Sequence, residues 1–301
     1  MRTLVSSLFG LAIALAVAQD AAETTFQYKF KEQQQEKYQT TVELNGNLPI
    51  PGAAGMAGVL KLNMTVFLKV DRVDTEKGAT VQTGLEAFEA EFNGQPFPVG
   101  LDMAKNVIPD SSATVHPAGK IGGIKGGGGL MGFQLPGFDP RNLATMLVPT
   151  EFPDKPLKVG DKWQFVRVFG EGENALQIPI TATFAGFEEV DGKKLLKVTQ
   201  EFDLPIESYQ DAFYQPTKDK ESAARVTKGT MKGTMTLWYH PEDGVLYKGV
   251  LSASMNQTTE PIKKDGSEIK DYERESSQLT LSATIVRKET TTANVEQGAS
   301  T

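Results

Sequence analysis

Apolar and polar residues alternate with a period of two along most of the chain. The pattern is clear in 26–30, in 278–288 and, except at Phe67, in 61–70, where apolar residues take every second position. Because successive side chains of a β-strand point to opposite faces of a sheet, this alternation predicts strands with one buried and one exposed face. After the first 18 residues, nothing before residue 140 shows convincing helical periodicity. We therefore expect an all-β protein with mainly antiparallel strands.

The segment 233–259 contains two long strand-like runs joined by Pro241-Glu242-Asp243-Gly244. Proline early in a turn presets φ, and glycine at its end accepts positive φ. This combination predicts a β-hairpin.

Short motifs recur in the same order in the two halves of the chain. The first match is Glu36-Lys37-Tyr38-Gln39 with Asp161-Lys162-Trp163-Gln164. The second is the set Phe67, Val70, Val73 and Asp74 with the set Phe184, Phe187, Val190 and Asp191, followed at the same spacing by Val81 with Val198. The third is His116-Pro117 with His240-Pro241. A repeat in fixed order predicts two similar units in tandem, built as strongly curved, half-barrel-like sheets. Two alternatives stay open: turn motifs shared by many β-proteins, and a single continuous sheet around a shared core.

Composition shifts divide the chain into five segments. These are a signal peptide at 1–18, a first β unit at 24–125, a Gly/Pro-rich connector at 126–156, a second β unit at 157–288, and a disordered tail at 289–301.

The connector contains one predicted short helix near 140–147. Asp139-Pro140 is a favourable helix start, with Asp as N-cap and Pro at the first helical position. Leu143, Met146 and Leu147 then lie on one face, and Pro149 limits the helix. Two interpretations follow: a connector whose helix packs on the core, or a mobile lid over an apolar cavity.

The N-terminus predicts secretion. Arg2 precedes an apolar run from Leu4 to Ala18, and Ala16-Val17-Ala18 gives the small-x-small pattern of a cleavage site. We expect cleavage after Ala18, a periplasmic or extracellular location, and no stable membrane span after cleavage; the alternative is an uncleaved anchor. The chain has no cysteine, so it forms no disulfide.

Charge and candidate chemistry narrow the function classes. The net charge is −7, and without a basic patch nucleic acid is not an expected partner. His116 and His240 are the only histidines, and a zinc site needs three or four ligands, so they are expected to end strands rather than bind metal. No Ser, His and Asp constellation has a recognisable context, and no cofactor is indicated. A hydrolase with converging acids is the least supported hypothesis.

Three stretches carry a resemblance to a known family: "KPLKVGDKW" at 155–163, "LVPTEFPDKP" before it, and "YKFKEQQQEKYQTTVE" at 28–43. They resemble a family of uncharacterised secreted bacterial proteins, known as a domain of unknown function, in which Gly-Asp-x-Trp follows a proline-rich connector, as Gly160-Asp161-Lys162-Trp163 does here. The first half departs from it, with Gln35-Glu36-Lys37-Tyr38. The resemblance implies no established activity. The expected architecture is also similar to the half-barrels of bacterial lipoprotein carriers and lipid-binding lipoproteins.

These observations lead to two main hypotheses of function. The first is a non-catalytic protein that binds an apolar small molecule, a lipid or a lipidated partner on the concave face of a curved sheet. Its candidate lining residues are Trp163, Trp238, Leu143, Met146 and Leu147; for the two tryptophans, ordinary core packing is the alternative. The second hypothesis is a structural or protein-interaction module of the envelope, with an exposed apolar patch or sheet edge and no cavity.

Overall fold

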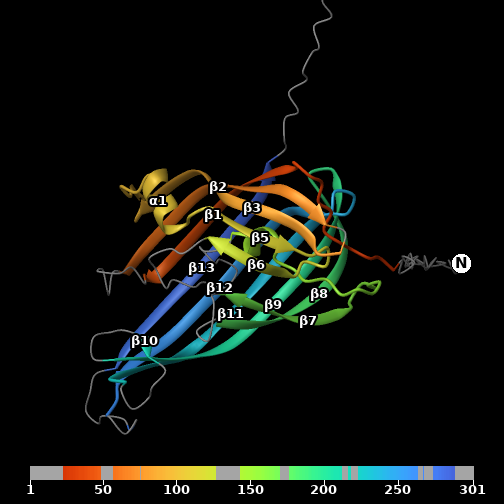
Figure 1. Ribbon diagram of the computed structural model, residues 1–301. Coiled ribbons are helices and arrows are strands. Elements are labelled where there is room, and N and C mark those ends of the chain that lie inside the picture. Colours follow the sequence, from red (N-terminus) through yellow and green to blue (C-terminus); the bar gives the residue numbers. More distant parts are fainter. Residues whose placement is uncertain are drawn as a thin grey trace, which may run out of the picture.

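The computed structural model shows one large, curved, antiparallel sheet that does not close on itself (Figure 1). The structure describes residues 23–48, 57–74, 76–126, 143–169, 176–211, 216–217, 223–263, 267 and 274–288. The all-β class is therefore confirmed. The expected signal peptide at 1–18, the tail at 289–301 and the helix start at Asp139-Pro140 lie outside the described residues.

The described residues contain 13 strands. In chain order they are β1 Gln35–Asn47, β2 Ala57–Asp74, β3 Gly78–Phe92, β4 Gln95–Pro96, β5 Ser111–Val115, β6 Ile121–Gly126, β7 Lys162–Phe169, β8 Leu176–Val190, β9 Lys193–Gln210, β10 Pro216–Thr217, β11 Arg225–His240, β12 Val245–Pro261 and β13 Glu275–Lys288.

The sheet is continuous through both halves of the chain. Its order is β6-β5-β3-β2-β1-β13-β12-β11-β9-β8-β7, with β4 beside β3 and β10 beside β9. The two halves join where β1 pairs with β13, in a register that places Thr40 opposite Ile285. The alternative of one continuous sheet is thus the arrangement observed. Strands β6 and β7 are the two ends, and each pairs with a single neighbour in the described sheet.

The internal repeat stays a prediction. In the first half, the turn between β2 and β3 closes with Asp74 opposite Gly78. In the second half, the turn between β8 and β9 closes with Val190 opposite Lys193, which leaves a two-residue loop of Asp191 and Gly192. Both loop residues have positive φ, 51° and 72°, as a tight hairpin turn requires. The matched motifs therefore lead into turns of different length.

The described residues contain two short helices, α1 Leu101–Val107 and α2 Ala144–Leu147. Helix α1 was not expected, because seven residues give only about two turns in which a 3.6-residue period can show. Asp102 in its first turn and Lys105 in its last turn complement the helix dipole. Neither helix within the described ranges has the length and apolar character needed to span a bilayer.

His116 directly follows β5, and His240 is the last residue of β11. The Nδ1 atom of His116 accepts the backbone N–H of Ala118 at 3.2 Å, and that of His240 accepts the N–H of Asp243 at 3.3 Å. Within the described residues, no group of three or more His, Asp or Glu side chains is placed to hold a metal ion. Each imidazole thus accepts a backbone N–H of the turn that follows it, two residues on for His116 and three residues on for His240.

The segment before β1 joins these two turns. The Tyr28 N–H donates to the carbonyl of Pro117 at 2.8 Å, and the Lys29 N–H donates to the carbonyl of Gly244 at 3.1 Å. Gly244 has a φ of 64°, and a Cβ there would lie 2.6 Å from the backbone nitrogen of Lys29. Glycine is therefore required at this position, both for the turn and for the close approach of the N-terminal segment.

A partly buried ion pair fixes the junction between the halves. Arg287 on β13 holds the Glu36 carboxylate of β1 through Nε at 2.6 Å and Nη2 at 3.0 Å, and its Nη1 reaches Asp243 at 2.6 Å. Glu36 is only 4% exposed. The hydrogen bonds from Arg287 lower the pKa of Asp243. The guanidinium of Arg287 therefore connects strands β1 and β13 with the turn between β11 and β12.

Replacing Arg287 with Ala is expected to destabilise the fold. Breaking a buried pair costs about 3–5 kcal/mol, and the partial exposure of Arg287 places our expectation near 3 kcal/mol. The matched control is Lys232→Ala, which removes an exposed ion pair with Asp203 and is expected to cost about 1 kcal/mol or less. Denaturant unfolding of both variants checks this. Equal losses would contradict the role given to Arg287.

Candidate functional site

Residues 143–156 of the connector, together with Leu157, lie against the inner face of the sheet. Their apolar side chains belong to the same buried cluster as the strands; they are Leu143, Ala144, Leu147, Val148, Phe152 and Leu157. The Phe152 N–H donates to the carbonyl of Ala118 at 2.7 Å, which attaches the connector to the turn after β5. The connector thus covers apolar surface that an open sheet would otherwise expose to water.

A buried arginine anchors the connector to β7. Arg167 Nη2 donates to the carbonyl of Val148 at 2.5 Å, and Nη1 donates to the carbonyl of Gly119 at 3.2 Å. Nη1 also lies 3.3 Å from the carboxylate of Glu151. One guanidinium therefore joins the edge strand β7, the connector and the turn between β5 and β6. A planar group with five N–H donors suits such divergent acceptors.

A second set of hydrogen bonds centres on Thr150 of the connector. Its Oγ1 accepts from Gln200 Nε2 on β9 at 2.5 Å and shares a hydrogen bond with the Tyr239 hydroxyl on β11 at 2.5 Å. Its backbone N–H donates to the Tyr28 hydroxyl at 3.4 Å. We call Tyr28, Thr150, Glu151, Arg167, Gln200 and Tyr239 the connector lock.

Burial governs the ionisation of the connector lock. Desolvation raises the pKa of Glu151, and the attraction of Arg167 offsets only part of that rise. Desolvation likewise lowers the pKa of Arg167. It raises the pKa of Tyr28 to about 12, and that of Tyr239 well above its usual value. Both phenols therefore stay protonated at neutral pH and act as neutral hydrogen-bonding groups.

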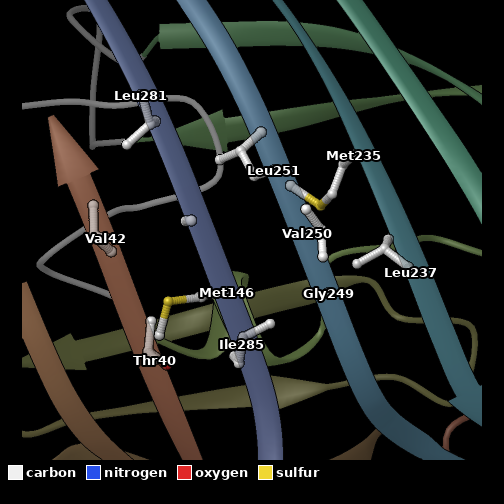
Figure 2. A pocket seen from close by; sticks show the side chains of 11 residues that line it. Thr40, Val42, Met146, Met235, Leu237, Gly249, Val250, Leu251, Leu281 and Ile285 are labelled. Carbon is white, nitrogen blue, oxygen red and sulfur yellow. The ribbon is translucent and has the colours of Figure 1, made fainter. Parts of the chain in front are cut away.

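An apolar cavity of about 40 Å³ lies between the connector and four neighbouring strands (Figure 2). Its lining comes from β1, β13, β12 and β11 and from the connector; the residues are Thr40, Val42, Met146, Met235, Leu237, Gly249, Val250, Leu251, Leu281, Ala283 and Ile285. Apart from Thr40, every lining side chain is aliphatic or a methionine. Met146 and Met235 are partly exposed, so the cavity approaches the surface beside them.

The three candidate lining residues of the connector divide into two groups. Met146 lines the cavity and is the connector's contribution to its wall. Leu143 and Leu147 are almost fully buried within the core and do not reach the cavity. Figure 2 labels Met146 together with the strand residues that complete the lining.

The two tryptophans lie away from the cavity, and apart from each other. The Trp163 indole N–H donates to the carbonyl of Glu151 at 2.6 Å, and its ring lines an open groove of about 590 Å³ between the connector, β7 and the turn after β5. Trp238 alternates with the buried Leu237 and Tyr239, so it lies on the outer face of the sheet. Its ring is flanked by two lysine ammonium groups, each 5.6 Å from the ring centroid.

Arg167 and Thr40 were not predicted from the sequence, although the period-two pattern of their strands places both at inward-facing positions. Arg167 follows Trp163 and Phe165 at every second position of β7, which assigns it to the inner face. Thr40 lies between Tyr38 and Val42 on the inner face of β1. A polar residue at an inward position is the signal that could have found them, because such a group needs a partner.

No protein-family model matches the chain, and a comparison with curated proteins also finds no match. The resemblance of the Gly160–Trp163 element to a family of secreted bacterial proteins stays a prediction. The site is therefore interpreted from its own geometry.

Replacing the two charged residues of the connector lock, Arg167 and Glu151, is expected to change the stability of the fold in different ways. Arg167→Met leaves two carbonyl groups and Glu151 without their donor, and we expect it to cost about 3–5 kcal/mol of unfolding free energy. Glu151→Gln mimics the protonated acid, which the fold prefers because burial raises the pKa. It should be at least as stable as the wild type at neutral pH.

The stability difference between Glu151→Gln and the wild type depends on pH, and the raised pKa of Glu151 gives the direction of this dependence. A raised pKa contributes stability that is present at low pH and is lost as pH rises through the folded-state pKa. The stability gap between Glu151→Gln and wild type should therefore shrink in acid. Denaturant unfolding as a function of pH measures this gap, and a Glu151→Gln variant as unstable as Arg167→Met would contradict the account.

Proposed function

We propose that the protein is a non-catalytic, extracytoplasmic carrier that binds an apolar chain, from a lipid or a lipidated partner, between the sheet and the connector. The observation that carries this proposal is the apolar cavity walled by Met146. Protein interiors are close-packed, so a void with an almost wholly hydrocarbon lining beside the surface is a candidate binding site.

The cavity must grow to accept such a chain. An engineered apolar cavity of about 150 Å³ binds benzene, whereas the cavity here measures about 40 Å³. Met146 is the part of the wall that can move most easily, since methionine is unbranched, flexible and here partly exposed. A ligand chain would take the place of its side chain.

The free energies involved allow a ligand chain to replace the Met146 side chain. Removing a fully buried methionine side chain costs about 2–5 kcal/mol, which is an upper bound for the partly exposed Met146. Each methylene group that a ligand buries contributes about 0.8 kcal/mol. A chain that buries about six methylene groups therefore offsets the displacement of Met146, and longer acyl chains bind with net gain.

A second candidate function is an interaction module of the envelope. Strand β7 ends the sheet, and its outward side chains Val166 and Val168 are 48% and 46% exposed. An edge strand with exposed apolar residues is suited to pairing with another chain. Val166→Lys should abolish retention of a partner from envelope extracts and leave ligand binding intact. Unchanged retention would remove this candidate.

Variants of Met146 test the carrier function. Met146→Ala enlarges the cavity and should bind a fluorescent fatty acid several-fold more tightly than the wild type, whereas Met146→Trp fills the space and should bind it more weakly. Met103→Ala is the matched control, because Met103 lies on α1 and is 55% exposed. Fluorescence titration measures all three.

Organic extraction of the purified protein, followed by mass spectrometry, provides the independent measurement. We expect an acyl-chain compound to be extracted from the wild type and a smaller amount from Met146→Trp. The proposal fails if no compound is extracted and neither the wild type nor Met146→Ala binds the fatty acid.

A further inference from the structure

One lining residue of the apolar cavity carries a polar group without a partner. Thr40 on β1 is 1% exposed, and within the described residues its Oγ1 has no hydrogen-bond partner. Its backbone lies in the ladder between Met64 on β2 and Ile285 on β13, so the fold does not need the hydroxyl to position the strand. An unpaired buried hydroxyl costs about 1–3 kcal/mol, and a valine of the same shape would avoid that cost.

The lining offers nothing else to which the hydroxyl could bond. Every other side chain around the cavity is aliphatic or a methionine. A buried water needs two to four polar partners, and here it would find one side-chain hydroxyl. A polar atom brought in by the ligand is therefore the natural partner of Thr40 Oγ1.

The chemistry of the cavity also limits the charge of that atom. No cationic side chain lines the cavity, so a carboxylate or phosphate placed there would be buried without a counter-ion. A threonine hydroxyl both donates and accepts, and it suits a neutral oxygen. Any charged end of the ligand would have to stay outside, near Met146 and Met235.

We propose that Thr40 Oγ1 hydrogen-bonds a neutral oxygen of an otherwise apolar ligand, such as a hydroxyl or an ester carbonyl on an acyl or alkyl chain. This inference rests on the proposed function and specifies its ligand class. The cavity distinguishes an oxygen-bearing chain from a plain hydrocarbon, because a site with a buried polar group rejects a ligand that leaves this group unpaired.

The test compares two ligands of equal heavy-atom count, 1-decanol and undecane, as competitors of the bound fluorescent fatty acid. The wild type should prefer 1-decanol. Thr40→Val should bind 1-decanol about 5- to 10-fold more weakly and undecane no more weakly than the wild type, as expected for one hydrogen bond. Thr40→Ser keeps the hydroxyl and should keep the preference.

The matched control is Thr41→Val on the same strand. Thr41 faces the opposite side of the sheet, where its Oγ1 donates to Asn63 Oδ1 at 3.0 Å. The Thr41→Val variant should bind 1-decanol and undecane with the same affinities as the wild type. Thermal unfolding should show Thr40→Val to be at least as stable as the wild type, which verifies that the variant folds.

The outcomes test the role of Thr40 and the carrier function separately. If both ligands bind the wild type and Thr40→Val changes their affinities equally or not at all, the role of Thr40 is wrong and the carrier function stands. If no compound is extracted from the protein and neither the wild type nor Met146→Ala binds the fatty acid or the two ligands, the carrier function itself is wrong.

Discussion

A buried guanidinium on an edge strand holds the connector against an open sheet. The sheet has an apolar inner face, and its end strands β6 and β7 leave it unclosed. Something other than another strand must cover the inner face, because exposing that area to water is unfavourable. Arg167 holds the connector through the carbonyl of Val148 and the carboxylate of Glu151, and it also contacts the carbonyl of Gly119 in the turn between β5 and β6. The remaining groups of the connector lock fix Thr150 beside it.

This anchor divides the connector into a fixed part and an adaptable part. Residues 148–152 are held by hydrogen bonds to five parts of the fold: the N-terminal segment, the turn after β5, β7, β9 and β11. Helix α2 precedes them and has only four residues, too few to be stable alone. It stays in place through Leu143 and Leu147 in the core, while Met146 remains partly exposed over the cavity. A ligand can then displace one flexible side chain without releasing the anchor.

The sequence predicted the elements with strong local signals. The alternation in 61–70 and 278–288 marks strands β2 and β13, and Pro241 and Gly244 mark the β11–β12 turn. Helix α1 gave no signal because it is too short for a period to emerge. Strand β1 pairs with β13, which is far away in the sequence, and no local pattern encodes such a pairing.

The candidate site was predictable only in part. Apolar residues of the connector were expected to face the sheet, and Met146 does line the cavity. Trp238 was expected to line the concave face or to pack in the core, yet the alternation of β11 places it on the outer face of the sheet. Arg167 and Thr40 were missed because polar residues in strands are read as exposed by default. Their burial depends on which neighbours the fold brings to them, and that is a tertiary property.

Native-state hydrogen exchange on Arg167→Met tests the central claim most directly. If the guanidinium holds the connector, the amides of Val148 and Phe152 exchange in this variant by local opening, at a clearly lower free energy than the amides in the middle of β1 and β13, which stay protected up to the reduced global free energy of unfolding. Connector amides that stay as protected as in the wild type would contradict the account, as would connector amides that exchange in the variant only at the free energy of the strand amides.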